Sequence, residues 1–133
     1  MREREYILNT DPISWARPGL NKARRFYDKQ SQDKVIIGCS LRNQHGDDDF
    51  KFMGPLYVGA TFFVPKPLKG PKYTKKLPWS STRPDIDNFL KFIFDTITDT
   101  EIIWGDDSHV AWVDAKKFYD KNPRTHLIIR ELE

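Results

Sequence analysis

The chain lacks the features of a secreted or membrane protein. Cys39 is the single cysteine among 133 residues, so no internal disulfide can form, and we expect a reducing, cytoplasmic compartment. No apolar run approaches the about 18–20 residues that a membrane span needs, and the first residues hold no stretch resembling a secretion signal. The sequence therefore argues against disulfide scaffolds, zinc fingers built on cysteine pairs, membrane proteins and long repeat arrays.

Acidic residues are missing from residues 65–84, although this stretch carries five lysines and Arg83. Residues 17–34 are also mainly basic, while the acids gather at 47–49 and from 85 to 107. The net charge of +3, from 22 Lys+Arg against 19 Asp+Glu, hides this segregation. Two basic stretches beside an acidic cluster are typical of a polyanion-binding surface around a site that needs negative charge. Lysine-rich loops also occur merely because they favour hydration, and charge alone leaves both explanations open.

The apolar pattern predicts a single small α+β domain, in keeping with the length of the chain. Strands are expected at 5–8, 56–64, 109–115 and 125–132, and a helix at 31–44. A second helix is expected from an apolar stripe at helical spacing that runs from Ile86 to Ile97. The order β-α-β-α-β-β predicts a mixed sheet with the two helices packed on it.

The connections also carry expectations. The turn at 119–123 predicts that the last two strands pair as a hairpin. Residues 12–30 read as a basic loop without a clear period. Residues 65–84 contain five prolines and predict a loop of unusual length, which we expect to be mobile without its ligand.

An acidic constellation lies at the predicted start of the second helix and in the turn that follows this helix. Asp85 and Asp87 would point about 200° apart in a regular helix, so both can face one site only if Asp85 precedes the first turn. Lys91 lies one turn after Asp87, and the turn with Asp106 and Asp107 could return a third carboxylate to this site. Clustered carboxylates suit a hard cation such as Mg²⁺, which can activate water for phosphodiester hydrolysis.

Each of these residues also has an ordinary structural explanation. Asp85 and Asp87 can be helix-start acids favoured by the macrodipole, and Asp87 with Lys91 can be an i,i+4 ion pair. Asp106 and Asp107 can simply form a turn. Taken together, and beside a basic loop, they favour metal-dependent phosphoryl chemistry by a small margin.

Residues 83–91, Arg-Pro-Asp-Ile-Asp-Asn-Phe-Leu-Lys, and residues 103–110, Ile-Trp-Gly-Asp-Asp-Ser-His-Val, resemble the RusA-type Holliday junction resolvases, or crossover junction endodeoxyribonucleases. The signature of that family is an Asp-x-Asp-Asn-x-x-Lys helix start, followed by a helix, a turn and an Asp-Asp pair that opens a strand. The close match covers residues 83–110, and a looser one covers most of the chain. The resemblance implies a small endonuclease that acts as a homodimer, depends on Mg²⁺ or Mn²⁺ and cuts four-way DNA junctions.

The resemblance also implies roles for individual residues. Asp85, Asp87 and Asp107 match the metal-binding catalytic carboxylates, Lys91 matches the catalytic lysine, and Asp106 is a supporting acid and possible ligand. The family more often has glutamine at position 109, and we favour a strand position over a DNA contact for His109. We expect DNA backbone contacts from the basic residues of the two stretches: Arg24, Arg25, Lys66, Lys69, Lys72, Lys75, Lys76 and Arg83.

Three functions stay open from the sequence. The leading one is a junction-resolving nuclease, and the others are a binding module that holds branched or duplex DNA without cutting it and a nuclease for flaps or other branched DNA. A pure binder gains nothing from acids that face phosphate, which counts against the second. The four tryptophans are candidates for a dimer interface, although large aromatic residues more often lie in a core: Trp15, Trp79, Trp104 and Trp112.

Overall fold

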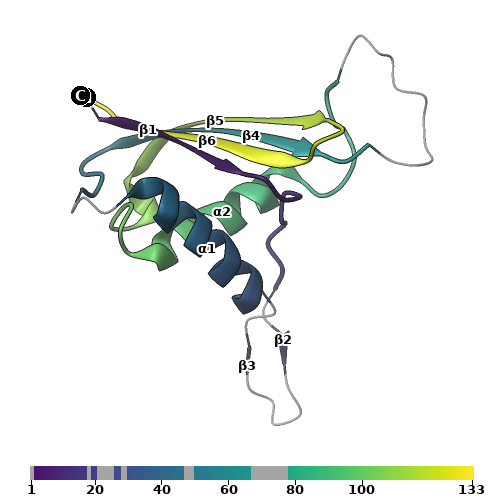
Figure 1. The fold of residues 1–133 in the computed structure, drawn as a ribbon, viewed down its shortest axis with the longest axis horizontal. Helices are drawn as coiled ribbons and strands as arrows, with labels where there is room; N and C mark the ends of the chain where they lie inside the picture. The colour runs from purple at the N-terminus through teal and green to yellow at the C-terminus, as the bar shows by residue number, and fades with distance from the viewer. Residues whose placement is uncertain (1, 18, 21–25, 28–29, 47–49, 67–77) are drawn as a thin grey trace.

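A four-stranded mixed sheet and two helices make up the fold. The computed structural model describes residues 2–17, 19–20, 26–27, 30–46, 50–66 and 78–133. The sheet has the order β1-β6-β4-β5 and consists of β1 (Glu3–Leu8), β4 (Leu56–Val64), β5 (Val110–Tyr119) and β6 (Arg124–Glu131). The helices α1 (Ser31–His45) and α2 (Ile86–Thr100) lie together on one face of this sheet (Figure 1). The predicted α+β class and element order are confirmed for these six elements.

β4 is one of the two inner strands of the sheet, and its position explains the main error of the sequence prediction. It pairs with β5 in parallel on one edge and with β6 antiparallel on the other. The predicted hairpin of the last two strands is therefore wrong, because β4 lies between them. The four residues between Tyr119 and Arg124 need to span two strand spacings, about 10 Å, which is within their reach.

The residue pattern of β4 is that of a strand with one covered face. Its buried and half-buried residues alternate along all nine positions, with the buried set facing the helices. α2 buries Phe89, Ile93 and Ile97 of the predicted stripe and Phe92 in addition. The Phe62 and Phe89 rings stack with centroids 5.1 Å apart, which joins the sheet to the helix. The core thus lies between one face of the sheet and the helical layer.

The element ends lie within three residues of expectation, except that β5 runs to Tyr119, four residues beyond its predicted end. α1 begins at Ser31 and is followed by Gly46, whose φ of 89° lies in the left-handed region that favours glycine. Within the stretch that the sequence predicts as a basic loop, β2 (Gly19–Leu20) and β3 (Phe26–Tyr27) form a small antiparallel sheet. Two-residue strands are too short to produce a recognisable alternation. In the described part of the chain, no helix has the length and apolarity to cross a membrane.

A buried histidine links β1 to the end of α1. The His45 side chain is 1% exposed, and its Nδ1 accepts a hydrogen bond from the Tyr6 hydroxyl at 2.7 Å. Its Nε2 donates to the Phe50 carbonyl at 2.6 Å. Burial raises the pKa of Tyr6 to about 12, which keeps its hydroxyl protonated as the donor. His45 therefore has a structural role.

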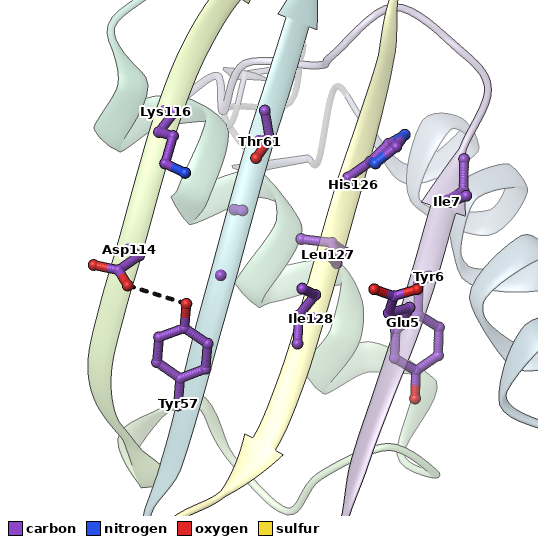
Figure 2. A pocket seen from close by; sticks show the side chains of 12 residues that line it. Glu5, Tyr6, Ile7, Tyr57, Thr61, Asp114, Lys116, His126, Leu127 and Ile128 are labelled. Carbon is purple, nitrogen blue, oxygen red and sulfur yellow. Dashed lines mark hydrogen bonds between the residues drawn. The ribbon is translucent and has the colours of Figure 1, made fainter.

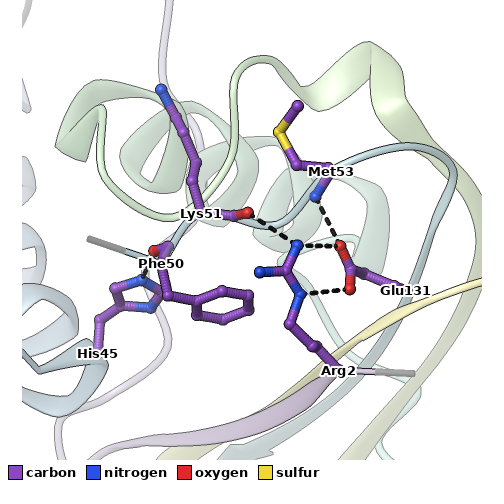
Figure 3. Close-up of polar contacts among 6 residues, drawn as sticks. All are labelled: Arg2, His45, Phe50, Lys51, Met53 and Glu131. Carbon is purple, nitrogen blue, oxygen red and sulfur yellow. Dashed lines mark hydrogen bonds and ion pairs between the residues drawn. The ribbon is translucent and has the colours of Figure 1, made fainter. Parts of the chain in front are cut away.

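An ion pair between Arg2 and Glu131 joins the two ends of the chain near the same corner of the fold (Figure 3). The Arg2 guanidinium donates to both carboxylate oxygens of Glu131, at 2.6 and 2.8 Å, and the Met53 amide donates to one of them at 2.9 Å. The hydrogen bond from Arg2 is the main reason that the pKa of Glu131 falls from its ordinary 4.5 to about 2. The pair ties β1, β6 and the segment before β4 together.

We expect this pair to make stability depend on pH. Because the pKa of Glu131 is lower in the folded chain, its contribution is fully present above about pH 4.5 and is lost as the pH falls toward 2. Glu131→Gln should lower the free energy of unfolding by about 1 kcal/mol at pH 6, and the difference from wild type should shrink at pH 3. Urea unfolding at both pH values measures this, with Glu133→Gln as the matched control. An equal loss at the two pH values would contradict it.

Candidate active site

Asp85 and Asp87 lie at the start of α2 in the arrangement that a shared site requires. Asp85 is the N-cap residue, with extended backbone angles of φ −69° and ψ 145°, and its side chain makes no capping hydrogen bond. Its carbonyl accepts the Asn88 amide at 3.1 Å. Asp87 lies in the first turn, and both side chains are exposed. Asp85 therefore precedes the regular helix. The side chains of Asp85 and Asp87 are thus not forced to point about 200° apart, as they would be within a helix.

The segment that leads into α2, residues 78–85, is held against β5, and we call it the brace. The Ser80 amide donates to the Lys117 carbonyl at 2.9 Å, and the Tyr119 amide donates to the Pro78 carbonyl at 2.8 Å. The Lys117 Nζ then donates to the carbonyls of Thr82 and Pro84 at 2.6 and 2.8 Å. These bonds position the backbone immediately before Asp85, so Lys117 has a structural role that its charge alone does not reveal.

Trp15 positions Lys91 from a distant part of the chain. The Trp15 amide donates to the Asn88 carbonyl at 2.9 Å, which attaches the segment before β2 to the first turn of α2. The Lys91 Nζ lies 4.9 Å from the centroid of the Trp15 ring, a cation–π contact that restricts the lysine. Trp15 is thus beside the predicted site, although no sequence spacing links it to Lys91.

Asp106 and Asp107 lie between α2 and β5. Asp107 begins the short 3₁₀ helix η1 (Asp107–His109), which ends one residue before β5, so His109 lies just outside the strand in which we expected it. The Asp106 carboxylate accepts the Ser108 amide at 3.1 Å. Hydrogen bonding by Ser108, first through its side chain and then through its amide, lowers the pKa of Asp106. Asp106 therefore stabilises its own turn, in agreement with a supporting role, while Asp107 is half-buried.

Asp95 joins Lys91 and Asp107 in one electrostatic group. Burial is the main cause that raises the pKa of Asp95, and the charge of Asp107 raises it further. The charges of Lys91 and of Lys34 on α1 act in the opposite direction. The structure therefore brings Asp107 near the Lys91–Asp95 half of the α2 face. The recurrence of charge at 87, 91 and 95 is the sequence signal for this group, and the predicted site does not include Asp95.

The donors at α2 have the chemistry of a hard-cation site. In the described residues, no hydrogen bond or ion pair occupies the carboxylates of Asp85, Asp87 or Asp107, and oxygen ligands are those that Mg²⁺ prefers. Across the same residues, no group of three His, Cys, Asp or Glu side chains lies close enough to hold a metal ion. The three-carboxylate ligand set therefore stays a prediction.

A pocket in the described part of the chain lies away from these residues. A shallow pocket of about 420 Å³ lies on the helix-free face of the sheet, between residues such as Glu5, Tyr57, Asp114 and His126. Figure 2 shows the Tyr57 hydroxyl donating to Asp114 across this pocket, at 3.0 Å. None of the predicted catalytic residues lines it. The candidate active site is instead an exposed surface, which suits a macromolecular substrate.

The predicted DNA contacts are only partly within the described residues. Lys66, just after β4, and Arg83, in the brace, are both exposed. The remaining predicted contacts lie outside the described residues: Arg24, Arg25, Lys69, Lys72, Lys75 and Lys76. The expected mobility of the long loop falls on the same undescribed stretch and stays a prediction.

Comparison with known proteins shows the family of the chain. The family described as Endodeoxyribonuclease RusA matches residues 9–130, and the chain belongs to that family. The chain is 29% identical over 133 residues to the "Crossover junction endodeoxyribonuclease rusA" of Lactococcus phage r1t, with 98% of each chain aligned. It is also 33% identical over 86 residues to the uncharacterized protein YqaN of Bacillus subtilis (strain 168), over 59% of each chain. The residues of the candidate site all lie within the family match.

We expect Asp95 to lower the stability of the folded chain at neutral pH. A carboxyl group whose pKa is raised on folding opposes folding wherever it is ionised, and this cost disappears below its unfolded pKa. Asp95→Asn should therefore give a modest rise in melting temperature at pH 7, and the rise should vanish near pH 3.5. Thermal unfolding followed by circular dichroism at the two pH values measures both. A variant that is less stable than wild type at pH 7 would contradict the assignment.

Proposed function

We propose that the chain is a structure-selective endodeoxyribonuclease that resolves four-way (Holliday) DNA junctions by paired nicking. The observation that carries this proposal is the end-to-end similarity to a phage protein named as a crossover junction endodeoxyribonuclease. The exposed acids at the start of α2 support it independently, since they suit catalysis on phosphate better than binding of phosphate alone. A cytoplasmic location, where cellular or phage DNA is processed, belongs to the same proposal.

The proposed catalytic group consists of Asp85, Asp87, Asp107 and Lys91. The three carboxylates would hold Mg²⁺, or Mn²⁺ in its place, with Asp106 as a possible further ligand. A cation held by these carboxylates would supply Lewis-acid chemistry, polarising the scissile phosphate and lowering the pKa of the attacking water. Lys91, restricted by the Trp15 ring, would stabilise the charge that builds on the phosphate oxygens. The brace would hold the carboxylates of Asp85 and Asp87 in a fixed position against the phosphate backbone of the substrate.

We infer that the active form is a homodimer. A four-way junction has two symmetry-related strands to cut, and each chain carries one candidate site. A two-fold dimer would provide two sites in matching orientation. Lys66, Arg83 and the predicted contacts outside the described residues would bind backbone phosphates and contribute little to base recognition.

A cleavage assay tests the function directly. The chain is incubated with a synthetic four-way junction, a flap substrate and a linear duplex, each with Mg²⁺, with Mn²⁺ and with a chelator. We expect paired nicks in the junction only, and only with a divalent cation. Preferential cleavage of the flap would assign the chain to a nuclease of other branched DNA. Binding of the junction without any cleavage would make it a non-catalytic binding module.

The ligand set is tested by Asp87→Asn. This change removes the charge of one proposed ligand but keeps the shape and the basic surface, so junction cleavage should be abolished while junction affinity stays within a few-fold of wild type. Asp99→Asn, the same change near the other end of the same helix, is the control and should leave cleavage unchanged. Cleavage at the wild-type rate by Asp87→Asn would remove Asp87 from the site.

A further inference from the structure

Trp79 presents a large aromatic ring to solvent from a rigid backbone. Its side chain is 52% exposed, and its ring centroid lies 4.4 Å from that of Phe118. Trp79 also forms an isolated bridge with Phe118, and the hydrogen bonds of the brace hold the residues on either side. A tryptophan that is half-exposed and fixed in this way is ready to accept a ligand on its open side, because burying it further requires little loss of chain entropy.

The Trp79 ring is the end of a continuous aromatic surface, which we call the platform. The Phe118 ring lies 5.9 Å from that of Phe63, and the Phe63 ring lies 5.3 Å from that of His126. The Arg124 guanidinium lies 3.8 Å from the Phe63 centroid. Figure 2 shows His126 on the helix-free face of the sheet, on the strand next to Thr61. The platform therefore occupies the end of this face from which the brace leads into the active site.

The chemistry of the platform favours a nucleic-acid base. Flat rings flanked by a guanidinium bind bases by stacking and by cation–π contact, without selecting among sequences. Lys66 lies near the same end of the sheet, because it follows β4 by two residues and the carbonyl of Val64, the last residue of β4, accepts the Asp120 amide at 3.0 Å. Asp120 itself is within 3.3 Å of the Arg124 guanidinium, so its charge is offset. A phosphate beside the platform would therefore not meet an uncompensated negative charge from Asp120.

The opposite end of the same sheet face offers a comparison. Trp112 is 51% exposed, and its ring lies 4.9 Å from that of Tyr57. Here the flanking acids are Asp114, which accepts the Tyr57 hydroxyl, and Glu3, which lies 3.5 Å from Arg130. Trp112 is also remote in sequence from the brace. The Arg130 guanidinium lies 4.3 Å from the Tyr57 centroid, so both ends of the face have rings flanked by a guanidinium. The two ends differ in their acids and in their distance along the chain from the brace, which makes the equally exposed Trp112 the control for Trp79.

We propose that the platform stacks against a base exposed at the branch point of the DNA, with Trp79 as the principal contact. This inference rests on the proposed function, because a base must leave the stack before it can lie against the platform, and we expect this to cost less at a branch point than within continuous duplex DNA. Trp79 lies six residues before Asp85 on the brace. Stacking at Trp79 would therefore position the scissile phosphate at the start of α2 and make cleavage selective for branched DNA.

The test compares Trp79→Ala, Trp79→Phe and Trp112→Ala by fluorescence anisotropy on a labelled four-way junction and a linear duplex. We expect Trp79→Ala to weaken junction binding about tenfold, the order of one stacked base, and to leave duplex binding unchanged. Trp79→Phe should recover most of the loss, and Trp112→Ala should stay within twofold of wild type. A 2-aminopurine placed at the branch point should be quenched by the wild-type chain and brighter with Trp79→Ala.

The remaining outcomes overturn the inference. Equal junction affinity of Trp79→Ala and wild type would remove Trp79 from the DNA surface. If Trp112→Ala weakened junction binding as much as Trp79→Ala, the location of Trp79 on the brace would have no part in junction binding. If the sedimentation coefficient changed for Trp79→Ala but not for the other variants, the platform would be assigned to contact between subunits. Unchanged circular dichroism of each variant guards against unfolding. If wild type fails to cut any branched DNA, the proposed function fails; if it cuts but Trp79→Ala binds normally, only the stacking inference fails.

Discussion

The pairing of β4 on both edges is the constraint on which the rest of the structure depends. β5 runs parallel to β4, so the chain must return from one end of the sheet to the other between them. α2 makes this return across one face and supplies much of the core through Phe89, Ile93 and Ile97. The same pairing brings the end of β5 and the start of α2 to one end of the sheet.

This juxtaposition places the candidate site. Lys117, near the end of β5, can reach the carbonyls of Thr82 and Pro84 only because the two segments meet there. Asp85 and Asp87 are exposed at the start of α2. Asp95 and Asp107 are half-buried, and the charge of Asp107 acts on Asp95. Concentrating negative charge in this way costs stability, which is typical of sites that bind a ligand or perform chemistry.

The two faces of the sheet have different roles. One is covered by α1 and α2, and the other keeps aromatic residues at both ends around a shallow pocket. A nuclease that acts on a branched duplex needs an extended surface rather than an enclosed pocket. A covered face for the core and an open face beside the brace are compatible with that need.

Local patterns in the sequence determined most of the secondary structure and indicated the residues of the candidate site. The stripe from Ile86 to Ile97, the alternation along β4 and the Asp85–Asp87–Lys91 spacing are all short-range features, because helix and strand periods repeat within a few residues. The order of the strands in the sheet was not determined in this way. A short turn after β5 fits either a hairpin with β6 or a connection that crosses β4. Only the pairing of β5 and β6 with opposite edges of β4 decided between them. The contact of Trp15 with Lys91 and the brace made by Lys117 likewise join residues far apart in the chain. Such contacts arise only when the sheet closes, since no local period connects their members.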